Sequence, residues 1–479
     1  YIPMSLHLII SALIPIYTGA HASLSRPSSA ASPPPRKRKR SASSTSSSSS
    51  SDDEDESTVK MEGLSPSDAV VFPLIAGATL VGFYVLIKYF GPQLLNKVLG
   101  IYFSFMACFS VGKMVADLVR VGEGFVWPAY YVDQGRVWRV RQAEKRVEAV
   151  GGEEGERKSP LPGRWGRMEL GDALVGWAWF ARGLLSKEYE VKLRFRGTTA
   201  LKAKLSLRAV TAGFFGVAVV LYANLVDTPW YLTNLQGFAF SYAALQLLSP
   251  TTFATGSLIL VALFFYDIYF VFYTPIMVSV ATNLDIPIKM LFPRPETEDK
   301  KPSLAMLGLG DVVLPGIMIG LALRFDLYLH YLRRQTKKDK SSGQTESIGE
   351  DISSSEKRLT DQEILKLPYV PATTRWGERF WTLGWTNNTG TGSGSKTITS
   401  IVPRFKKTYF YASIVGYVIG MTTTLVVMHV FKHAQPALLY LVPGVLGSVW
   451  LTALVRGEVK DMWAYTEMVE EEDEKEDGK

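Results

Sequence analysis

The stretch Leu263–Met277 reads LFFYDIYFVFYTPIM and the stretch Leu304–Leu323 reads LAMLGLGDVVLPGIMIGLAL, and these two decide the fold. Each is apolar enough to lie within a bilayer, and each contains one charged residue, Asp267 or Asp311. A carboxylate at that depth costs about 2.5–3.5 kcal/mol on insertion scales, so such residues face a protein interior and serve chemistry or transport. Two carboxyl groups brought together there share a proton, which supplies one general base and one general acid.

The composition of the chain is that of a membrane protein. Of its 479 residues, 47% are hydrophobic, and apolar blocks alternate with polar loops. Cys108 is the single cysteine and lies in an apolar block, so neither an internal disulfide nor a cysteine zinc site can form. The net charge of +7 comes from the loops, and we expect no nucleic-acid partner. The five histidines are scattered and no H-E-x-x-H motif occurs, so we expect no metal and no other cofactor.

Nine apolar segments predict an all-α polytopic membrane protein with nine transmembrane helices. The segments lie at residues 4–20, 70–90, 94–117, 207–227, 233–249, 254–277, 304–325, 408–431 and 434–455. The predicted active site lies between the sixth and the seventh. The first segment ends in Ala20-His21-Ala22, which resembles a signal-peptidase cleavage site, so a retained helix and a cleaved signal peptide are both open. We favour the retained helix because no basic region precedes the segment.

The polar stretches divide the chain into units. The membrane units are the first helix at 1–20, helices two and three at 70–117, helices four to seven at 207–325, and helices eight and nine at 408–455. The remaining units are a disordered linker at 21–69, a loop at 118–206, a second disordered loop at 326–407 and an acidic tail at 456–479. The loop at 118–206 contains one apolar island, Leu174–Leu185, which is too short to span a membrane and predicts an interfacial or packed helix.

Basic residues set the expected topology. With nine spans and an N-terminus outside the cytosol, the long loops rich in Lys and Arg all fall on the cytosolic side, as the positive-inside rule requires. The C-terminus is then cytosolic as well. The stretch 278–303 is the exception, because it lies on the opposite side with four basic residues, which four acidic residues offset. The sequon Asn387-Asn388-Thr389 falls on the cytosolic side and should stay unmodified.

Three short motifs are candidates for the chemistry. Tyr266-Asp267 is flanked by aromatic residues that limit access of water. Gly308-Leu309-Gly310-Asp311 places glycines beside an acid, where they permit close backbone approach or a loosened helix. Gln435-Pro436-Ala437-Leu438 opens the ninth segment, where proline leaves the preceding chain extended and its polar groups accessible to a substrate backbone.

Each motif alone also has a structural explanation. A lone intramembrane aspartate can serve as a hydrogen bonder between helices, and two in adjacent segments can equally form an ion site or a proton relay. The charges alone support two hypotheses equally: a protease, and a non-enzymatic transporter that uses the aspartates for proton coupling. Inverted repeats would favour the transporter, and none is visible. A serine intramembrane protease is disfavoured because no membrane serine has a Gly-x-Ser-x-Gly setting.

The three motifs, in this order, resemble the signatures of the GxGD intramembrane aspartyl proteases. The longer runs LFFYDIYFVF, IPIKMLFPR and QPALLYLVPG look like the signal peptide peptidase branch rather than the presenilins. The run ALIPIYTGAHASL is similar to the first segment of that family, which strengthens the prediction of a retained helix. The stretch 278–303 is short, whereas presenilins carry a long autoprocessed loop between the two catalytic helices.

The resemblance implies an enzyme of the endoplasmic-reticulum membrane with a lumenal N-terminus. Its catalytic residues would be Asp267 and Asp311, acting as a unit in which neither role can be assigned. Its substrate-binding residues would be Tyr266, Gly308, Leu309, Gly310, Gln435, Pro436, Ala437 and Leu438. Its partners would be the lipid bilayer and membrane-embedded signal peptides or type II membrane segments, with a homo-oligomer or quality-control proteins of the endoplasmic reticulum as further expectations.

Overall fold

The computed structural model describes twelve stretches of the chain. These are residues 2–31, 61–150, 155–168, 171–195, 198–226, 228–284, 286–293, 304–342, 367–373, 375–382, 404–431 and 435–467. The predictions of disorder at 21–69 and 326–407, the sequon at Asn387 and the end of the acidic tail fall wholly or mostly outside the described residues.

Helices form most of the described chain. Their bounds are α1 Ile2–Ala22, α2 Asp68–Phe90, α3 Pro92–Val126, α4 Asp172–Ser186, α5 Leu207–Leu225, α6 Trp230–Leu247, α7 Phe253–Phe272, α8 Ile276–Asn283, α9 Gly310–Ser342, α10 Trp376–Trp381, α12 Thr408–Phe431, α13 Leu438–Arg456 and α14 Val459–Ala464. Within the described ranges, eight of them are long and apolar enough to cross a membrane, namely α1, α2, α3, α5, α7, α9, α12 and α13. The chain is therefore a polytopic membrane protein.

The difference between nine predicted spans and these eight lies in α6. This helix covers most of the predicted segment 233–249, but it is too polar to count as a candidate span. Its Asn234, Gln236 and Gln246 are buried. The Asn234 side-chain amide donates to the Leu291 carbonyl at 2.8 Å and accepts from the Leu291 N–H at 2.7 Å. The buried Asn234 of α6 is therefore satisfied by hydrogen bonds to the backbone of β9. A mean hydropathy does not detect such partners.

The expectation of an all-α fold is corrected by several short strands. In the stretch 118–206, an antiparallel sheet has the order β2 Tyr130–Asp133, β3 Arg136–Arg141, β4 Arg146–Val150 and β5 Glu156–Arg157. Gln134 and Gly135, with φ of 51° and 72°, form the tight turn between β2 and β3. Trp179 of α4 packs against Tyr131 and Trp138 of this sheet. In β3 the apolar Val137, Trp138 and Val140 are buried and the three arginines are exposed, which is typical of a strand with one solvated side.

Three further strand pairs complete the list. They are the hairpin of β6 Glu188–Phe195 with β7 Thr198–Ser206, the parallel pair of β1 Glu62–Leu64 with β8 Leu248–Pro250, and the antiparallel pair of β9 Lys289–Pro293 with β10 Leu304–Gly308.

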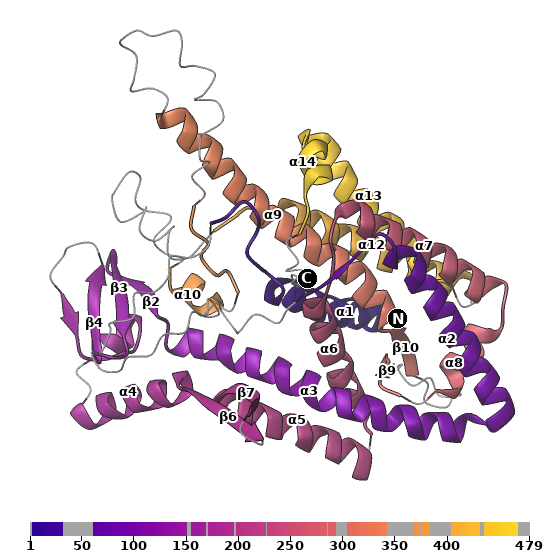
Figure 1. Cartoon of the computed structure of the whole chain (residues 1–479), viewed down its shortest axis with the longest axis horizontal. Coiled ribbons are helices and arrows are strands. Elements are labelled where there is room, and N and C mark those ends of the chain that lie inside the picture. Colours follow the sequence, from indigo (N-terminus) through magenta and orange to yellow (C-terminus); the bar gives the residue numbers. More distant parts are fainter. Residues whose placement is uncertain are drawn as a thin grey trace, which may run out of the picture.

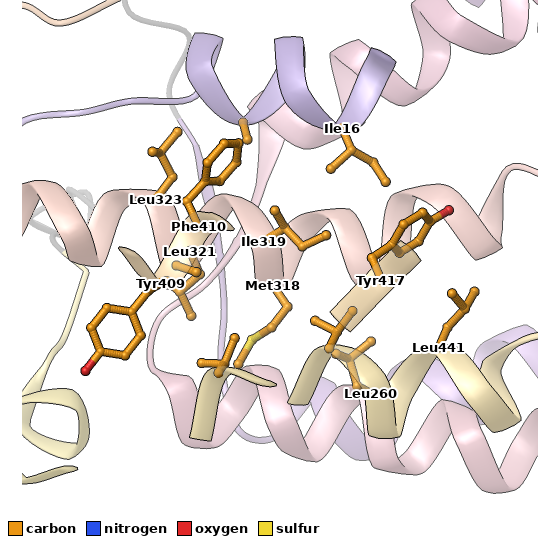
Figure 2. Close-up of a cluster of buried hydrophobic side chains, with 14 of the residues drawn as sticks. Ile16, Leu260, Met318, Ile319, Leu321, Leu323, Tyr409, Phe410, Tyr417 and Leu441 are labelled. Atoms are coloured by element: carbon orange, nitrogen blue, oxygen red, sulfur yellow. The ribbon is translucent and has the colours of Figure 1, made fainter. Parts of the chain in front are cut away.

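α9 is the central helix of the molecule. In its membrane-length window 83% of residues are buried, against at most 44% in any other candidate span. It packs against α1, α6, α7, α12 and α13. Figure 2 shows Met318 and Ile319 of α9 between Ile16 of α1 on one side and Leu260 and Leu441 of α7 and α13 on the other. A residue at the start of α9 is therefore held by the best-packed element of the fold.

The two stretches that decide the fold are each interrupted. α7 ends at Phe272, shortly before Pro275, and α8 begins at Ile276, because proline cannot continue a helix. The predicted seventh helix, 304–325, begins as strand β10 and becomes helical only at Gly310. It then continues to Ser342, well beyond the predicted end.

The predicted active site and the sheet-containing part of the protein lie at opposite ends of α3 (Figure 1). We call β2–β5, α4 and α10 the polar cap. The cap lies at the C-terminal end of α3, whereas α8, β9 and β10 lie near its N-terminal end.

Candidate active site

Asp267 lies in the last part of α7 and is only 4% exposed. Its Oδ2 accepts a hydrogen bond from the backbone N–H of Leu438 at 3.0 Å. Leu438 is the first residue of α13, and the N–H groups in a first helical turn have no partner within the helix. Asp267 therefore caps α13, at the end where the helix dipole favours negative charge.

Asp311 lies in the first turn of α9 and is half-buried. α7 packs against α9, and the charge of Asp267 acts on the Asp311 carboxyl. A Cβ at position 308 would lie 3.5 Å from Asp311 Oδ2, so this carboxyl lies over the backbone of Gly308. The Tyr417 hydroxyl of α12 donates to the Asp311 carbonyl at 3.3 Å. The structure thus brings together the two predicted carboxyl groups.

The turn at Leu309 fixes where α9 begins. The Leu309 N–H donates to the Ile288 carbonyl at 3.1 Å, and the Leu309 carbonyl accepts from Val312 and Val313 at 3.1 and 2.8 Å. Its side chain packs on α6, since a Cβ at Gly237 would meet Leu309 Cδ2 at 3.3 Å. Leu309 therefore anchors the strand-to-helix turn through both its backbone and its side chain.

Tyr266 faces α2. Its ring packs on Phe270 with 4.6 Å between ring centroids. A Cβ at Gly77 of α2 would lie 3.7 Å from the Tyr266 ring and 3.6 Å from the Phe270 ring. Tyr266 therefore fills the contact between α2 and α7, next to Asp267 in the chain.

The motif Gln435-Pro436-Ala437-Leu438 forms the entry to α13. Gln435 and Pro436 are not helical, as the sequence predicts, and α13 begins at Leu438. The Ala437 carbonyl accepts from the N–H groups of Tyr440 and Leu441 at 3.2 and 3.1 Å. The hydrogen bond from Leu438 to Asp267 is the feature that sequence reasoning missed, although an unsatisfied N–H after a proline was a signal for it.

Glycines hold α13 against α12. A Cβ at Gly416 would lie 2.2 Å from the Gly444 carbonyl oxygen, and a Cβ at Gly420 would lie 2.7 Å from the Tyr440 carbonyl oxygen. No larger side chain fits at either position without separating the helices. This close approach fixes α13, and with it the Leu438 N–H, relative to the rest of the site.

Two further features border the carboxyl pair. β10 pairs with β9, and within the described residues no strand covers its other edge. An apolar cavity of about 70 Å³ lies between α2, α7 and α9. Val313 and Leu314, which follow Asp311 in α9, line this cavity together with Leu260 of α7. The strand edge therefore ends three residues before Asp311, and the apolar cavity follows α9 onward from Val313.

A second group of buried charges lies farther along α9. Asp326 accepts from the backbone N–H groups of Tyr409 and Phe410 at 3.3 and 3.0 Å, which caps α12. Arg324 donates to the hydroxyls of Ser23 and Ser249 at 2.7 and 2.5 Å.

The same arginine also forms an ion pair with Glu467, so Arg324 links the residue after α1, β8 and the C-terminal segment. Within the described ranges, no three His, Cys, Asp or Glu side chains are grouped as a metal ion would need.

The buried Asp267 and the half-buried Asp311 lie on two membrane-length helices that pack against each other, the arrangement expected of an intramembrane aspartyl protease. A family profile described as signal peptide peptidase matches residues 54–469. The signal peptide peptidases of Mus musculus and Homo sapiens are each 28% identical over 408 residues, which covers 85% of this chain and 74% of the relative. A probable intramembrane protease of Schizosaccharomyces pombe is 30% identical over 304 residues, which covers 61% of this chain and 79% of the relative.

No solved structure matches the chain. The chain belongs to the signal peptide peptidase family, and it is a multi-pass intramembrane protease.

Proposed function

We propose that Asp267 and Asp311 hydrolyse peptide bonds of substrates that lie within the membrane. The observation that carries this proposal is the pairing of the two carboxyl groups at the junction of α7 and α9. One carboxylate takes a proton from water as it attacks the scissile carbonyl, and the protonated partner donates to the departing amine. Family membership favours this reaction over proton-coupled transport.

The Leu438 N–H divides the roles within the pair. A hydrogen bond donated to a carboxylate stabilises its charged form, and this one reaches only Asp267. With one proton shared between the two groups, the negative charge is then favoured on Asp267. Asp267 is the base that activates water, and Asp311 is the acid that hydrogen-bonds the scissile carbonyl.

The open edge of β10 supports an extended substrate. A helical peptide bond is shielded by its own hydrogen bonds, so the substrate must unwind before it reacts. Unwound backbone inside a membrane needs partners, and a strand edge supplies them. The strand runs directly into Gly310 and Asp311, which places a paired substrate beside the carboxyl groups.

The substrate class follows from the named relatives. The mouse and human relatives are signal peptide peptidases, and we extend that substrate class to this chain. Membrane-embedded signal peptides and type II membrane segments are the proposed substrates, and the endoplasmic-reticulum membrane is the proposed location. The proposed topology has a lumenal N-terminus and a cytosolic C-terminus, with α1 retained and α6 added to the eight candidate spans. Burial of Leu8, Ala12, Ile16 and Ala20 along one face of α1 supports its retention.

Substitution of the two carboxyl groups tests the proposal. We expect Asp267→Asn and Asp311→Asn each to abolish cleavage of a labelled signal peptide by the full-length protein in nanodiscs. The amide matches the carboxyl in size but cannot exchange the proton. The matched control is Asp326→Asn, which alters a buried aspartate of α9 outside the pair and keeps one acceptor oxygen for the N–H groups of Tyr409 and Phe410. Substantial turnover in either of the first two variants would refute the assignment.

A further inference from the structure

A second cavity, of about 230 Å³, lies at the end of α3 that faces the polar cap. It is enclosed by the last turns of α3, by α4 and α10, and by the start of α5. The catalytic pair lies toward the other end of the molecule, where β10 meets α9 (Figure 1). The residues that line the cavity are Arg120, Glu123, Gly124, Trp127, Ala129, Arg182, Leu185, Arg208, Arg375 and Glu378.

The lining carries more positive than negative charge. Four arginines face two glutamates. Arg208 pairs with Glu123 at 2.7 Å, and both side chains are largely buried. Arg375 approaches Glu378 at 3.7 Å. The formal count leaves two positive charges that the lining itself does not balance, and a low-dielectric wall strengthens their attraction for an anion.

Two donors in this lining lack acceptors. Arg182 is 9% exposed, and its Nη1 has no hydrogen-bond partner within the described part of the chain. Burial lowers the pKa of Arg182 to about 10, against the opposing effect of the Glu378 charge. The indole N–H of Trp127 is also buried without a partner in the described ranges. Glu123 Oε1 and Glu378 Oε2 of the same lining also lack hydrogen-bond partners in the described ranges, but each carboxylate forms an ion pair, with Arg208 or Arg375. Buried donors are normally satisfied, so the two donors indicate an acceptor that occupies the cavity.

The outer face of α4 indicates where that acceptor comes from. Leu174, Trp177, Phe180 and Leu184 are exposed at helical spacing, while Arg182 on the other side of the helix lines the cavity. With 15 residues α4 is too short to span a bilayer. A helix with exposed Trp, Phe and Leu on one face lies in the membrane interface. The cavity then lies at the depth of lipid head groups, beside the ends of two candidate spans, α3 and α5.

We propose that this cavity binds the phosphate of an anionic phospholipid head group, with α4 resting in the interface beside it. Phosphate oxygens accept from Arg182 and Trp127 and balance the excess positive charge. Arginine suits this role because its planar fork presents paired donors to phosphate. The lipid would join α4 and α10 of the polar cap to α3 and α5.

Binding of short-chain lipids to the full-length protein in detergent tests the proposal. The probes are dioctanoyl phosphatidylinositol 4-phosphate, dioctanoyl phosphatidylcholine and inorganic phosphate, and their binding is measured by titration calorimetry. We expect saturable binding of the phosphoinositide, weak binding of the zwitterionic lipid and weak binding of inorganic phosphate. Arg182→Gln and Arg120→Gln should each weaken phosphoinositide binding by about tenfold or more, since a hydrogen bond to a charged group contributes that much.

The matched control is Arg146→Gln, which removes an exposed arginine of the polar cap that pairs with Glu156 outside the cavity. This variant should bind the phosphoinositide like the wild type. Arg182→Gln removes a buried side chain and could prevent folding. Arg120 is only partly buried, so the folded Arg120→Gln variant still tests the cavity. Wild-type affinity in Arg120→Gln would overturn the proposal, as would equal losses in all three variants. Inorganic phosphate that binds as tightly as the phosphoinositide would overturn the assignment to a lipid.

Discussion

Replacing Pro436 by alanine changes the geometry of the site while leaving both carboxyl groups in the protein. Pro436 is buried and lacks an N–H, and it holds the chain out of helix just before α13. Ala437 already has helical angles, with φ −68° and ψ −36°. Alanine at position 436 therefore lets α13 extend toward its N-terminus. The Leu438 N–H then lies within the extended helix and leaves Asp267.

The size of the effect follows from that one hydrogen bond. A hydrogen bond to a charged group contributes about 1.5–3 kcal/mol, and in the proposed mechanism it supports the charge on Asp267 that activates water. Since every 1.36 kcal/mol is tenfold in rate, we expect kcat to fall by about 10- to 150-fold. KM should change little, because Pro436→Ala leaves β10 and the apolar cavity intact.

The assay is steady-state cleavage of a labelled transmembrane peptide at equal amounts of folded protein, with thermal unfolding measured in parallel. The matched control is Pro443→Ala, the same substitution at an exposed position inside the same helix. This control should retain turnover, because Pro443 does not determine where α13 begins. A wild-type kcat in Pro436→Ala would refute the role of the Leu438 N–H, and an equal fall in Pro443→Ala would attribute the loss to general disturbance of α13.

Three further outcomes are expected. With the proposed topology, Asn387 carries no glycan on native protein, as mass spectrometry of the intact chain will show, and a glycan there contradicts a cytosolic loop. Gly416→Ala lowers the free energy of unfolding by about 1–3 kcal/mol because its Cβ meets the Gly444 carbonyl, whereas Gly447→Ala, with open space around it, leaves the melting temperature unchanged or raised. Asp326→Ala lowers stability by about 2 kcal/mol by uncapping α12, while turnover per folded molecule is retained, and an unchanged melting temperature would argue against the cap.

The carboxyl pair could be predicted from sequence because a charge inside an apolar stretch is costly wherever the chain goes. The change from strand β10 to helix α9 could not be predicted from the sequence. The run Leu304–Gly308 is continuously apolar, and such a run reads equally as a buried strand or as part of a helix. Its strand state depends on pairing with β9, a contact that local hydropathy does not contain.

The polar residues of the interior were missed for a related reason. Arg324 and Asp326 stood at the predicted end of the seventh helix, where charges usually mark the water boundary. They are buried because Ser23, Ser249 and the N-terminus of α12 supply partners from distant parts of the sequence. Asn234 is similar, since its partner Leu291 is 57 residues away. Partners of this kind become visible only once the chain is folded.

The link between Asp267 and Leu438 also sets an order for the synthesis of the protein. The donor follows its acceptor by 171 residues. At about 5–20 residues per second, a ribosome needs roughly 10 to 35 seconds to cover that distance. Late in this interval α7 and α9 have both been made, but the N–H that donates to Asp267 does not yet exist. A nascent chain therefore remains an incomplete catalyst until its last membrane helix has been inserted, and neighbouring nascent proteins are spared its activity for that time.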